Sequence, residues 1–409
     1  MKNQAVPAST ASTARGSVRL YFLDWLRVLA ILTVFVYHTT RFFNLEDWHV
    51  KNATTYGWLE VWNRAAVIWM MPLIFVISGA SLFYAVGKGG AGKFVKDKVL
   101  RLLVPLLVAD VTHCSLQVYL ERLTHGQFSG SYLQFLPHYF TGIYDGDNPA
   151  SGNFALTGMH LWYLFWLFLF SLLLYPLLSW LKGRGRGVLG RMGDLLAISG
   201  TVYVLVVPTV LLLVFARPDG LVMDLEEAGW SLFVYLWLLF CGFLLVSSEG
   251  VQASALRLRW ASLAIGAALS VAYLWLSFQP GGFSYGTLPY ALIVGLRGLG
   301  SWCLVLASLG LGMRYLNTST PFVRYANEAV LPFYILHQTV IVTLGYFVVQ
   351  WAIPDGPKFF IILSGSLVIV MGLYECLVRR FNVMRYLFGM KRKQHRATDV
   401  RSVLAGQGV

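Results

Sequence analysis

The chain has 409 residues, of which 57% are hydrophobic and 12% are charged, and its net charge is +13. Soluble proteins carry about 25% charged residues, so this composition excludes a soluble globular enzyme. Its apolar stretches reach about 20 residues, the length of a transmembrane helix, which also excludes an outer-membrane barrel built from alternating strands of about 10 residues.

Ten apolar segments predict an all-α fold, a polytopic transmembrane helical bundle. Ahead of them, residues 1–18 are small, polar and basic, which is typical of a disordered tail and not of a cleavable signal peptide. Behind them, residues 381–409 form a basic tail, so the membrane domain is expected at 19–380. The ten expected spans are 20–40, 62–86, 99–120, 160–181, 195–215, 229–247, 260–278, 288–313, 328–351 and 359–378.

The loops between these segments alternate in charge along the chain. One set is rich in lysine and arginine: 87–98, 181–191, 256–259, 313–324 and 379–396. The other set leans acidic: 44–60, 144–153, 217–227, 279–286 and 353–358. Because basic loops stay in the cytoplasm, the alternation predicts an even number of spans and two cytoplasmic termini. The positive net charge then reflects topology and contact with anionic membrane lipid, and no nucleic-acid partner is expected.

Three ionisable residues lie in the first span, where such residues are costly and are candidates for function. Arg27 and His38 are eleven residues apart, which on an α-helix is three turns plus roughly 20°, so they share one face about 16 Å apart. Asp24 lies three residues before Arg27, within reach of an ion pair. Two interpretations stay open: a polar stripe that faces the bundle interior, or an arginine that snorkels to the inner headgroups below a histidine at the outer interface.

The third span begins with a glycine-rich and basic stretch. Lys93 and Lys96 fit an ordinary positive-inside loop. Lys98 and Arg101 are three residues apart and share a helix face. The glycines make this loop mobile, but they do not form a phosphate-loop motif.

Later polar residues fall in or near the remaining spans. After the third span comes the longest outer segment, 121–158, and a connection of this length is often functional. His160 opens the fourth span beside Trp162 and is either part of an interfacial aromatic belt or a substrate ligand. His337 lies deep in the ninth span and is either a hydrogen-bonded core residue or a functional one. Further candidates without an assigned partner are Arg64, Asp110, His113, Arg297 and Glu375.

The order of these motifs resembles the acyltransferase 3 family of membrane proteins. The stretch YFLDWLRVLAILTVFVYH resembles the Arg-x10-His signature at the start of that family. In order, the later matches are an FxxSG motif at 75–79, a basic entry at 93–105, an HLWFL-like motif at 159–164 and a histidine-bearing span at 325–340. Within the family, 48–52 and 374–375 look most like the glucan biosynthesis protein C branch, which is associated with succinylation of periplasmic glucans.

The resemblance implies an enzyme, an O-acyltransferase in a bacterial inner membrane. Its co-substrate would be a cytoplasmic acyl-CoA, acetyl-CoA or succinyl-CoA, and its acceptor would be a hydroxyl of an extracytoplasmic glycan. No permanently bound cofactor and no metal are expected. The four cysteines lie in apolar segments without metal-ligand spacing or an implied disulfide framework: Cys114, Cys241, Cys303 and Cys376.

The resemblance also implies roles for individual residues. Arg27, Lys98 and Arg101 would bind the phosphates of the acyl-CoA, because fixed cations bind phosphate through charge-assisted hydrogen bonds. The catalytic set would be His38, Arg27 and Asp24. His38 would either remove the proton of the acceptor hydroxyl or carry the acyl group itself. The residues expected to bind the acceptor are His160, Trp162 and His337.

Two other classes of function remain. A transporter or flippase could use the intramembrane arginine and histidine residues as a proton or substrate path, and a scaffold or channel subunit would need no chemistry. The chain has no visible internal repeat, which weighs against the inverted-repeat transporters. Dependence on acyl-CoA separates the enzyme from the transporter.

Overall fold

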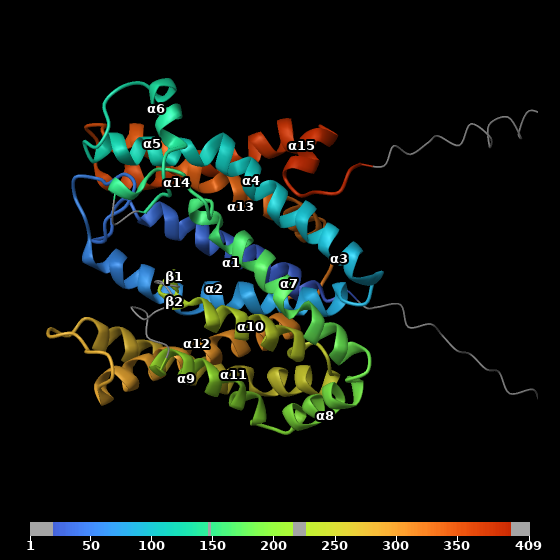
Figure 1. The fold of residues 1–409 in the computed structure, drawn as a ribbon. Helices are drawn as coiled ribbons and strands as arrows, with labels where there is room; N and C mark the ends of the chain where they lie inside the picture. Colours follow the sequence, from blue (N-terminus) through green and yellow to red (C-terminus); the bar gives the residue numbers. More distant parts are fainter. Residues whose placement is uncertain (1–18, 146–148, 216–225, 394–409) are drawn as a thin grey trace, which may run out of the picture.

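A computed structural model describes residues 19–145, 149–215 and 226–393. These residues form a bundle of roughly aligned helices (Figure 1). In this part of the chain the paired strands are two short ones, β1 (Glu226–Glu227) and β2 (Trp230–Ser231). The predicted all-α polytopic architecture is therefore confirmed. The expected disordered tail at 1–18 lies outside the described residues, as do residues 394–409 of the expected basic tail.

Ten helical segments correspond in order to the ten expected spans. They are α1 (Tyr21–Thr40); α2 (Gly57–Ala85); α3 (Gly90–Lys98), which runs through the π-helical turn η1 (Val99–Leu103), α4 (Val104–Ala109) and η2 (Asp110–Cys114) into α5 (Ser115–Thr124); η4 (Met159–Leu161) with α7 (Trp162–Lys182); α8 (Arg186–Ala197) with η5 (Thr201–Val206) and α9 (Val207–Phe215); α10 (Leu232–Leu245); α11 (Glu249–Ser277); α12 (Leu288–Tyr315); α13 (Pro321–Val348); and α14 (Asp355–Leu373) with η6 (Tyr374–Val378). The short helices α6 (Tyr132–Tyr139), η3 (Pro149–Ser151) and α15 (Asn382–Leu387) lie outside these segments.

The number of full membrane spans is close to the expected ten but not equal to it. Among the described residues, eight helices are long and apolar enough to cross a membrane, or nine if α8 and η5–α9, bent by 113° at their junction, count as one span. The remaining segment, α10, has 14 residues, fewer than the roughly 20 that a full crossing needs. Most of α10 is buried against its neighbours, so it does not have to face lipid over the whole bilayer.

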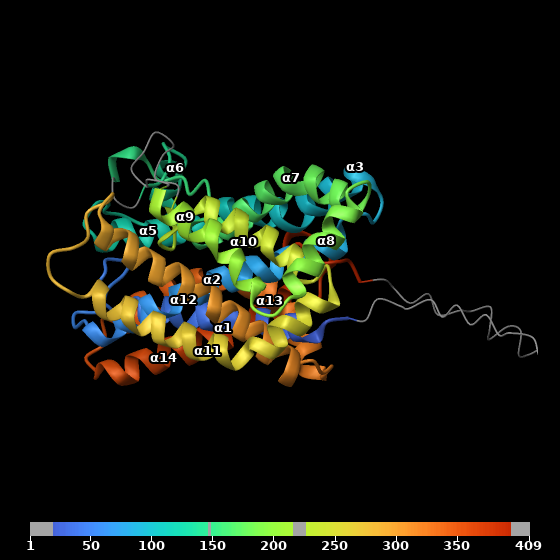
Figure 2. The ribbon, with the colours of Figure 1, turned by 90° about the horizontal axis from the view of Figure 1, so that it is seen from below.

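Both ends of the described chain lie at one end of the bundle, opposite α6 (Figure 1 and Figure 2). We call this the tail end, and the opposite one, which holds α6 and the loop 41–56, the cap end. Termini on one side agree with the even number of passes that the loop charges predict.

The close approach of α2 and α10 depends on two glycines. A Cβ atom at Gly79 would lie 1.8 Å from the carbonyl oxygen of Leu239, and one at Gly242 would lie 1.9 Å from that of Val76. Only glycine allows the two backbones to touch in this way, as at other helix contacts inside membranes. Packing of α2 against α10 therefore requires a glycine at position 79, the last residue of the FxxSG motif.

The expected outer segment begins later than residue 121, because α5 continues to Thr124. The chain then forms α6, whose first turn is closed by a capping box between Ser131 and Gln134. Isolated bridges from Gly142 to Gly152 and from Ile143 to Phe154 tie the rest of the segment together. The cap end is thus an ordered structure over the described residues.

The β1–β2 hairpin is inserted between helices of the bundle. Ala228 and Gly229 at its turn both have positive φ, 49° and 69°, as a tight hairpin turn of type I′ requires. The buried Trp230 donates from Nε1 to the carbonyl oxygen of Val67 at 3.0 Å. The guanidinium of Arg297 lies 4.1 Å from the centre of the Trp230 ring. These contacts fix the hairpin and its first strand, which carries Glu227.

We expect Glu227 to make the bundle more stable at pH 5 than at pH 8. Burial raises the pKa of its carboxyl group to about 7, whereas a glutamate in an unfolded chain titrates near about 4.3. Between these values the folded protein holds a proton that the unfolded chain has lost. This contribution to stability is therefore complete below about pH 4.3 and is lost as the pH rises through about 7. Melting temperatures in detergent at pH 5 and pH 8 measure it. Glu227→Gln should flatten the difference, and an unchanged difference in that variant would contradict the assignment.

Candidate functional site

Three histidines from three separate segments meet inside the bundle near the cap end. His38 comes from the last turn of α1, His160 from η4 and His337 from α13. The ring centre of His337 lies 5.2 Å from that of His38 and 4.9 Å from that of His160, and the His38 and His160 rings are 6.4 Å apart. The structure thus brings together the expected catalytic histidine and two of the expected acceptor ligands.

Backbone carbonyls determine which ring nitrogens of this cluster can accept a hydrogen bond. Nδ1 of His337 lies 2.7 Å from the carbonyl oxygen of Tyr334. A carbonyl only accepts, so a neutral ring carries its proton on Nδ1 and presents the lone pair of Nε2. Nε2 of His160 lies 3.2 Å from the carbonyl oxygens of Tyr334 and Ile335, so the free acceptor of that ring is Nδ1.

These free nitrogens are buried and have no hydrogen-bond partner among the described residues. The unpaired atoms are Nδ1 of His38, Nδ1 of His160 and Nε2 of His337. Buried polar atoms are nearly always paired, so an unpaired group calls for an explanation. Unpaired nitrogens at one place, two of which are acceptors, suit a ligand that brings hydrogen-bond donors, such as hydroxyl groups.

Aromatic side chains enclose the three histidines. The indole of Trp48, from the loop 41–56, stacks on the His38 ring at 6.1 Å and 16°. Phe333 stacks on His337 at 6.1 Å and 2°, and the hydroxyl of Tyr334 donates to the backbone carbonyl of His160. The imidazoles therefore lie in a mostly apolar environment with fixed orientations.

Arg27 lies at the tail end and is bound from the bundle interior. Its guanidinium donates to Oδ1 of Asn327 on α13 and to Oγ of Ser81 on α2, both at 3.0 Å, and to Oδ1 of Asp24 at 3.4 Å. These contacts favour the interior stripe over a snorkelling arginine. Asp24 forms its shorter contact, 2.7 Å, with Arg19. It lies about 21 Å from His38 by the rise of the helix, so any catalytic role of Asp24 has to act through Arg27.

Several polar side chains lie between Arg27 and the histidines in the bundle. Ser78 lies one turn from Ser81 on α2, and its Oγ is 2.6 Å from the hydroxyl of Tyr163 on α7. The ring of Tyr163 lies 5.8 Å from that of Tyr334, which contacts His160 and His337. We call Ser81, Ser78, Tyr163 and Tyr334 the polar strip. The serine of the FxxSG motif therefore contacts a tyrosine that packs beside the histidine cluster.

The other expected donor ligands lie on the segment that runs from α3 into η1. The ammonium of Lys98, at the end of α3, lies 5.4 Å from the centre of the Phe94 ring. Arg101 is exposed, and its backbone packs against Gly389, where a Cβ atom would come within 2.7 Å. The donor role of Lys98 and Arg101 stays a prediction.

Trp162 does not join the histidine cluster in the described residues. Its ring packs 6.2 Å from that of Phe75 and 5.4 Å from that of Tyr235. Two residues along a helix correspond to about 200° of rotation, which turns Trp162 away from the side that His160 faces. Its expected role in binding the acceptor has no support from this geometry.

A buried polar network at the cap end was not predicted from the sequence. Nδ1 of His49, in the loop 41–56, forms a short contact with Oε2 of Glu121 on α5. The side-chain nitrogen of Gln338 lies 3.1 Å from Nε2 of His49 and 3.0 Å from Oε1 of Gln117. The amide of Gln117 in turn donates to Oγ1 of Thr339 at 2.6 Å. Gln117 and Glu121 are four residues apart and share a helix face. This spacing would have indicated the network, but the expected third span ended at residue 120, before Glu121.

Three of the remaining polar candidates have structural partners, and Asp110 does not: both of its carboxylate oxygens are buried without a hydrogen-bond partner among the described residues. Arg64 bonds to Glu60 at 2.9 Å, Nε2 of His113 lies 3.2 Å from the carbonyl oxygen of Ile335, Glu375 pairs with Arg379 at 3.0 Å, and Asp110 is buried beside Gly158. In the described residues no group of three or more histidine, cysteine, aspartate or glutamate side chains could hold a metal ion. The three clustered histidines are therefore not arranged as a metal site.

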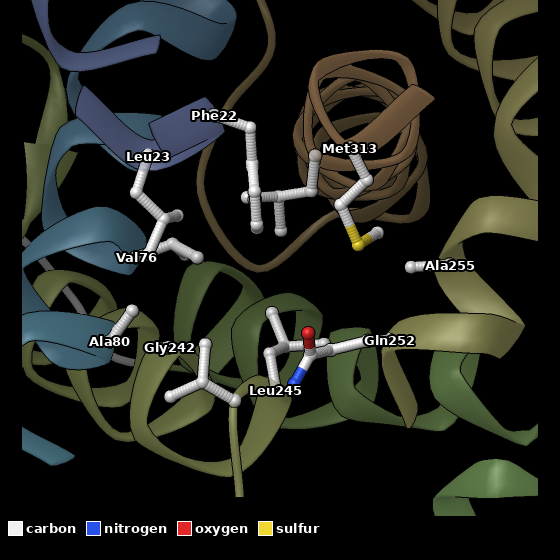
Figure 3. Close-up of a pocket in the computed structure, with 11 residues that line it drawn as sticks. Phe22, Leu23, Val76, Ala80, Gly242, Leu245, Gln252, Ala255 and Met313 are labelled. Carbon is white, nitrogen blue, oxygen red and sulfur yellow. The ribbon is translucent and has the colours of Figure 1, made fainter. Parts of the chain in front are cut away.

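Two cavities lie away from the histidines. A small one at the tail end is enclosed by α1, α2, α10, α11 and α12, with apolar side chains such as Phe22, Val76 and Met313 and the amide of Gln252 around it (Figure 3). Its volume of about 20 Å³ has room for about one water molecule, too little for an acyl-CoA. A second cavity of about 330 Å³ opens at the cap end between the loop 41–56, α5 and α13.

Similarity to known proteins covers nearly the whole chain. A family model described as an acyltransferase domain matches residues 20–375. The chain is also similar to curated proteins named glucans biosynthesis protein C from Salmonella agona (strain SL483) and from Salmonella paratyphi A (strain ATCC 9150 / SARB42). Each is 23% identical over 395 residues, which cover 91% of this chain and 95% of the relative. No solved structure matches the chain.

Proposed function

The chain belongs to the acyltransferase 3 family, whose model matches residues 20–375, and on that premise we propose that this membrane protein transfers an acyl group from a cytoplasmic acyl-CoA to a hydroxyl of a glycan on the other side of the membrane. The relatives named glucans biosynthesis protein C favour a glucan as the acceptor. The proposed membrane is the bacterial inner membrane, with the tail end in the cytoplasm because the basic loops belong to that side.

The observation that carries this proposal is the histidine cluster with its unpaired ring nitrogens. A glycan is dense in hydroxyl groups, which supply the missing donors. One imidazole can accept the proton of the reacting hydroxyl while a second accepts a hydrogen bond from a neighbouring hydroxyl. We assign the first task to His38 and the second to His160 and His337.

The two ends of the site correspond to the two substrates. Coenzyme A is large and charged and does not cross a bilayer, so its phosphates stay at the tail end. There Arg27 offers a guanidinium held by Asn327 and Ser81, a group suited to phosphate or to the amides of the donor arm. Lys98 and Arg101 are exposed or half-buried at the same end and add positive charge. In this proposal the acyl end reaches the histidines along the polar strip.

The reaction balances without a further reactant. The hydroxyl oxygen attacks the thioester carbonyl carbon as the imidazole of His38 takes the hydroxyl proton. A C–O bond forms, the C–S bond breaks, and the proton passes to the leaving thiolate, which gives the ester and free coenzyme A. In the two-step alternative the imidazole of His38 first accepts the acyl group and then passes it to the hydroxyl. The moved group is acetyl or succinyl in either case.

Mass spectrometry of envelope glycans from cells with and without the gene tests this function. We expect one acyl substituent to disappear with the gene and to return with the wild-type gene, and its mass identifies acetyl or succinyl. Complementation with His38→Gln should leave the glycans unmodified although the protein is present in the membrane. Identical glycans in both strains would contradict the proposed function.

A further inference from the structure

A buried acid–imidazole pair at the cap end has no role in the chemistry just described. His49 and Glu121 are 7% and 6% exposed, and His49 Nδ1 contacts Glu121 Oε2. The Glu121 carboxylate also accepts from the hydroxyl of Tyr144 at 2.9 Å. The backbone carbonyl of His49 accepts from Oγ1 of Thr124 at 2.8 Å. His49 is thus fixed to α5 through both its ring and its backbone.

The pair is connected to the histidine cluster on two sides through neighbouring residues. On one side, the residue before His49 is Trp48, whose indole stacks on His38. On the other side, His49 Nε2 lies 3.1 Å from the amide nitrogen of Gln338, the residue after His337. Because a carboxylate only accepts, it holds the proton of His49 on Nδ1 and leaves Nε2 free to accept the amide hydrogen of Gln338. The pair therefore holds Trp48, which stacks on His38, and Gln338, which follows His337 in the chain.

We propose that Glu121 and His49 are positioning residues for acyl transfer: their pair anchors the loop 41–56 to α5 and α13, so that Trp48 orients the His38 ring and Gln338 keeps His337 beside it. The expected effect on the rate of acyl transfer rests on the proposed function, whereas the positioning of the His38 and His337 rings does not. The essential feature of Glu121 is its charged carboxylate, which can only accept and so holds the His49 proton on Nδ1. A glutamine amide both donates and accepts, so it does not fix the position of that proton.

Glu121→Gln tests this proposal because it removes the charge and keeps the size of the side chain. We expect kcat for acyl transfer to fall about 10- to 100-fold, since small misplacement of a catalytic group costs on this scale. The KM for acyl-CoA should stay unchanged, because the donor's charged end binds at the tail end. Modification of His38 by diethyl pyrocarbonate, followed by peptide mass spectrometry, should become severalfold faster because Trp48 no longer covers the ring.

Tyr144→Phe is the matched control. It removes a hydroxyl that donates to the same carboxylate but leaves the contact with His49, so kcat and the modification rate of His38 should stay near those of the wild type. Trp48→Phe should keep most of the activity because a ring still stacks on His38, whereas Trp48→Ala should behave like Glu121→Gln.

Two results overturn the positioning role. One is a Glu121→Gln protein with wild-type kcat and wild-type modification of His38. The other is an equal loss of kcat in Glu121→Gln and Tyr144→Phe that is matched by an equal drop in their melting temperatures, because general destabilisation would then explain both losses. If the wild type transfers no acyl group from any acyl-CoA, the proposed function fails, and the modification rate of His38 still decides whether the pair positions it.

Discussion

Replacing His38 with alanine is expected to abolish detectable acyl transfer while the protein stays folded and still binds acyl-CoA. A hydroxyl is a weak nucleophile at neutral pH, and assistance by a positioned base is worth typically 10²–10⁴-fold. Donor binding should survive because Arg27 lies about 16 Å away along α1. The measurements are the rate of ester formation with purified protein in detergent and the affinity for acyl-CoA.

The companion variant His38→Gln separates polarity from basicity. Glutamine keeps a polar side chain of similar length but cannot take a proton, so it should be nearly as inactive as alanine. A labelled acyl group that stays on the wild-type protein when the acceptor is omitted would identify the two-step route. A well-folded His38→Ala protein that acylates its acceptor at near the wild-type rate would exclude His38 as the base and point to His337, the histidine whose Nε2 is free and buried.

Replacing Arg27 with glutamine is expected to weaken the binding of acyl-CoA by about 10- to 100-fold, since hydrogen bonds to charged groups contribute about 1.5–3 kcal/mol and each 1.4 kcal/mol is tenfold. The wild-type affinity should fall as salt rises, and the variant should show less of that dependence. Lys98→Gln and Arg101→Gln should have smaller effects of the same kind. Titration of purified protein with acyl-CoA at two ionic strengths measures all three.

Arg324→Gln is the control for this series. Arg324 is an exposed arginine near the start of α13 at the tail end, so its removal changes the net charge of that side equally. Its affinity for acyl-CoA should stay near that of the wild type. Donor affinity that is unchanged in all three of Arg27→Gln, Lys98→Gln and Arg101→Gln would mean that the donor site has been assigned to the wrong place.

Helical periodicity was enough to predict the first half of the site. The spacing of Arg27 and His38 places both on one face of a helix, and the structure turns that face inward, with Asn327 and Ser81 around the arginine. The same kind of argument applied to Trp162 would have turned it away from His160. Its expected acceptor role came from its place in a motif and not from its position on the helix.

The rest of the site depends on contacts between distant segments. His160 and His337 meet His38 only after α13 packs against α1 and η4 packs against α13, and no local pattern encodes that meeting. The pair of His49 and Glu121 spans 72 residues and needs the path of an irregular loop. The short α10 has the apolar composition of a full span, and its length became clear only from the hairpin that precedes it.

Transfer across a sealed bilayer tests the central claim most directly. The purified protein is reconstituted into proteoliposomes with a glucan oligosaccharide sealed inside, and labelled acyl-CoA, which does not cross the membrane, is added outside. Protein molecules with the tail end outward should acylate the enclosed glucan, and vesicles that carry His38→Ala should not. If labelled ester forms only when acyl-CoA and glucan are on the same side of the membrane, the path from Arg27 to the histidine cluster does not carry the acyl group across.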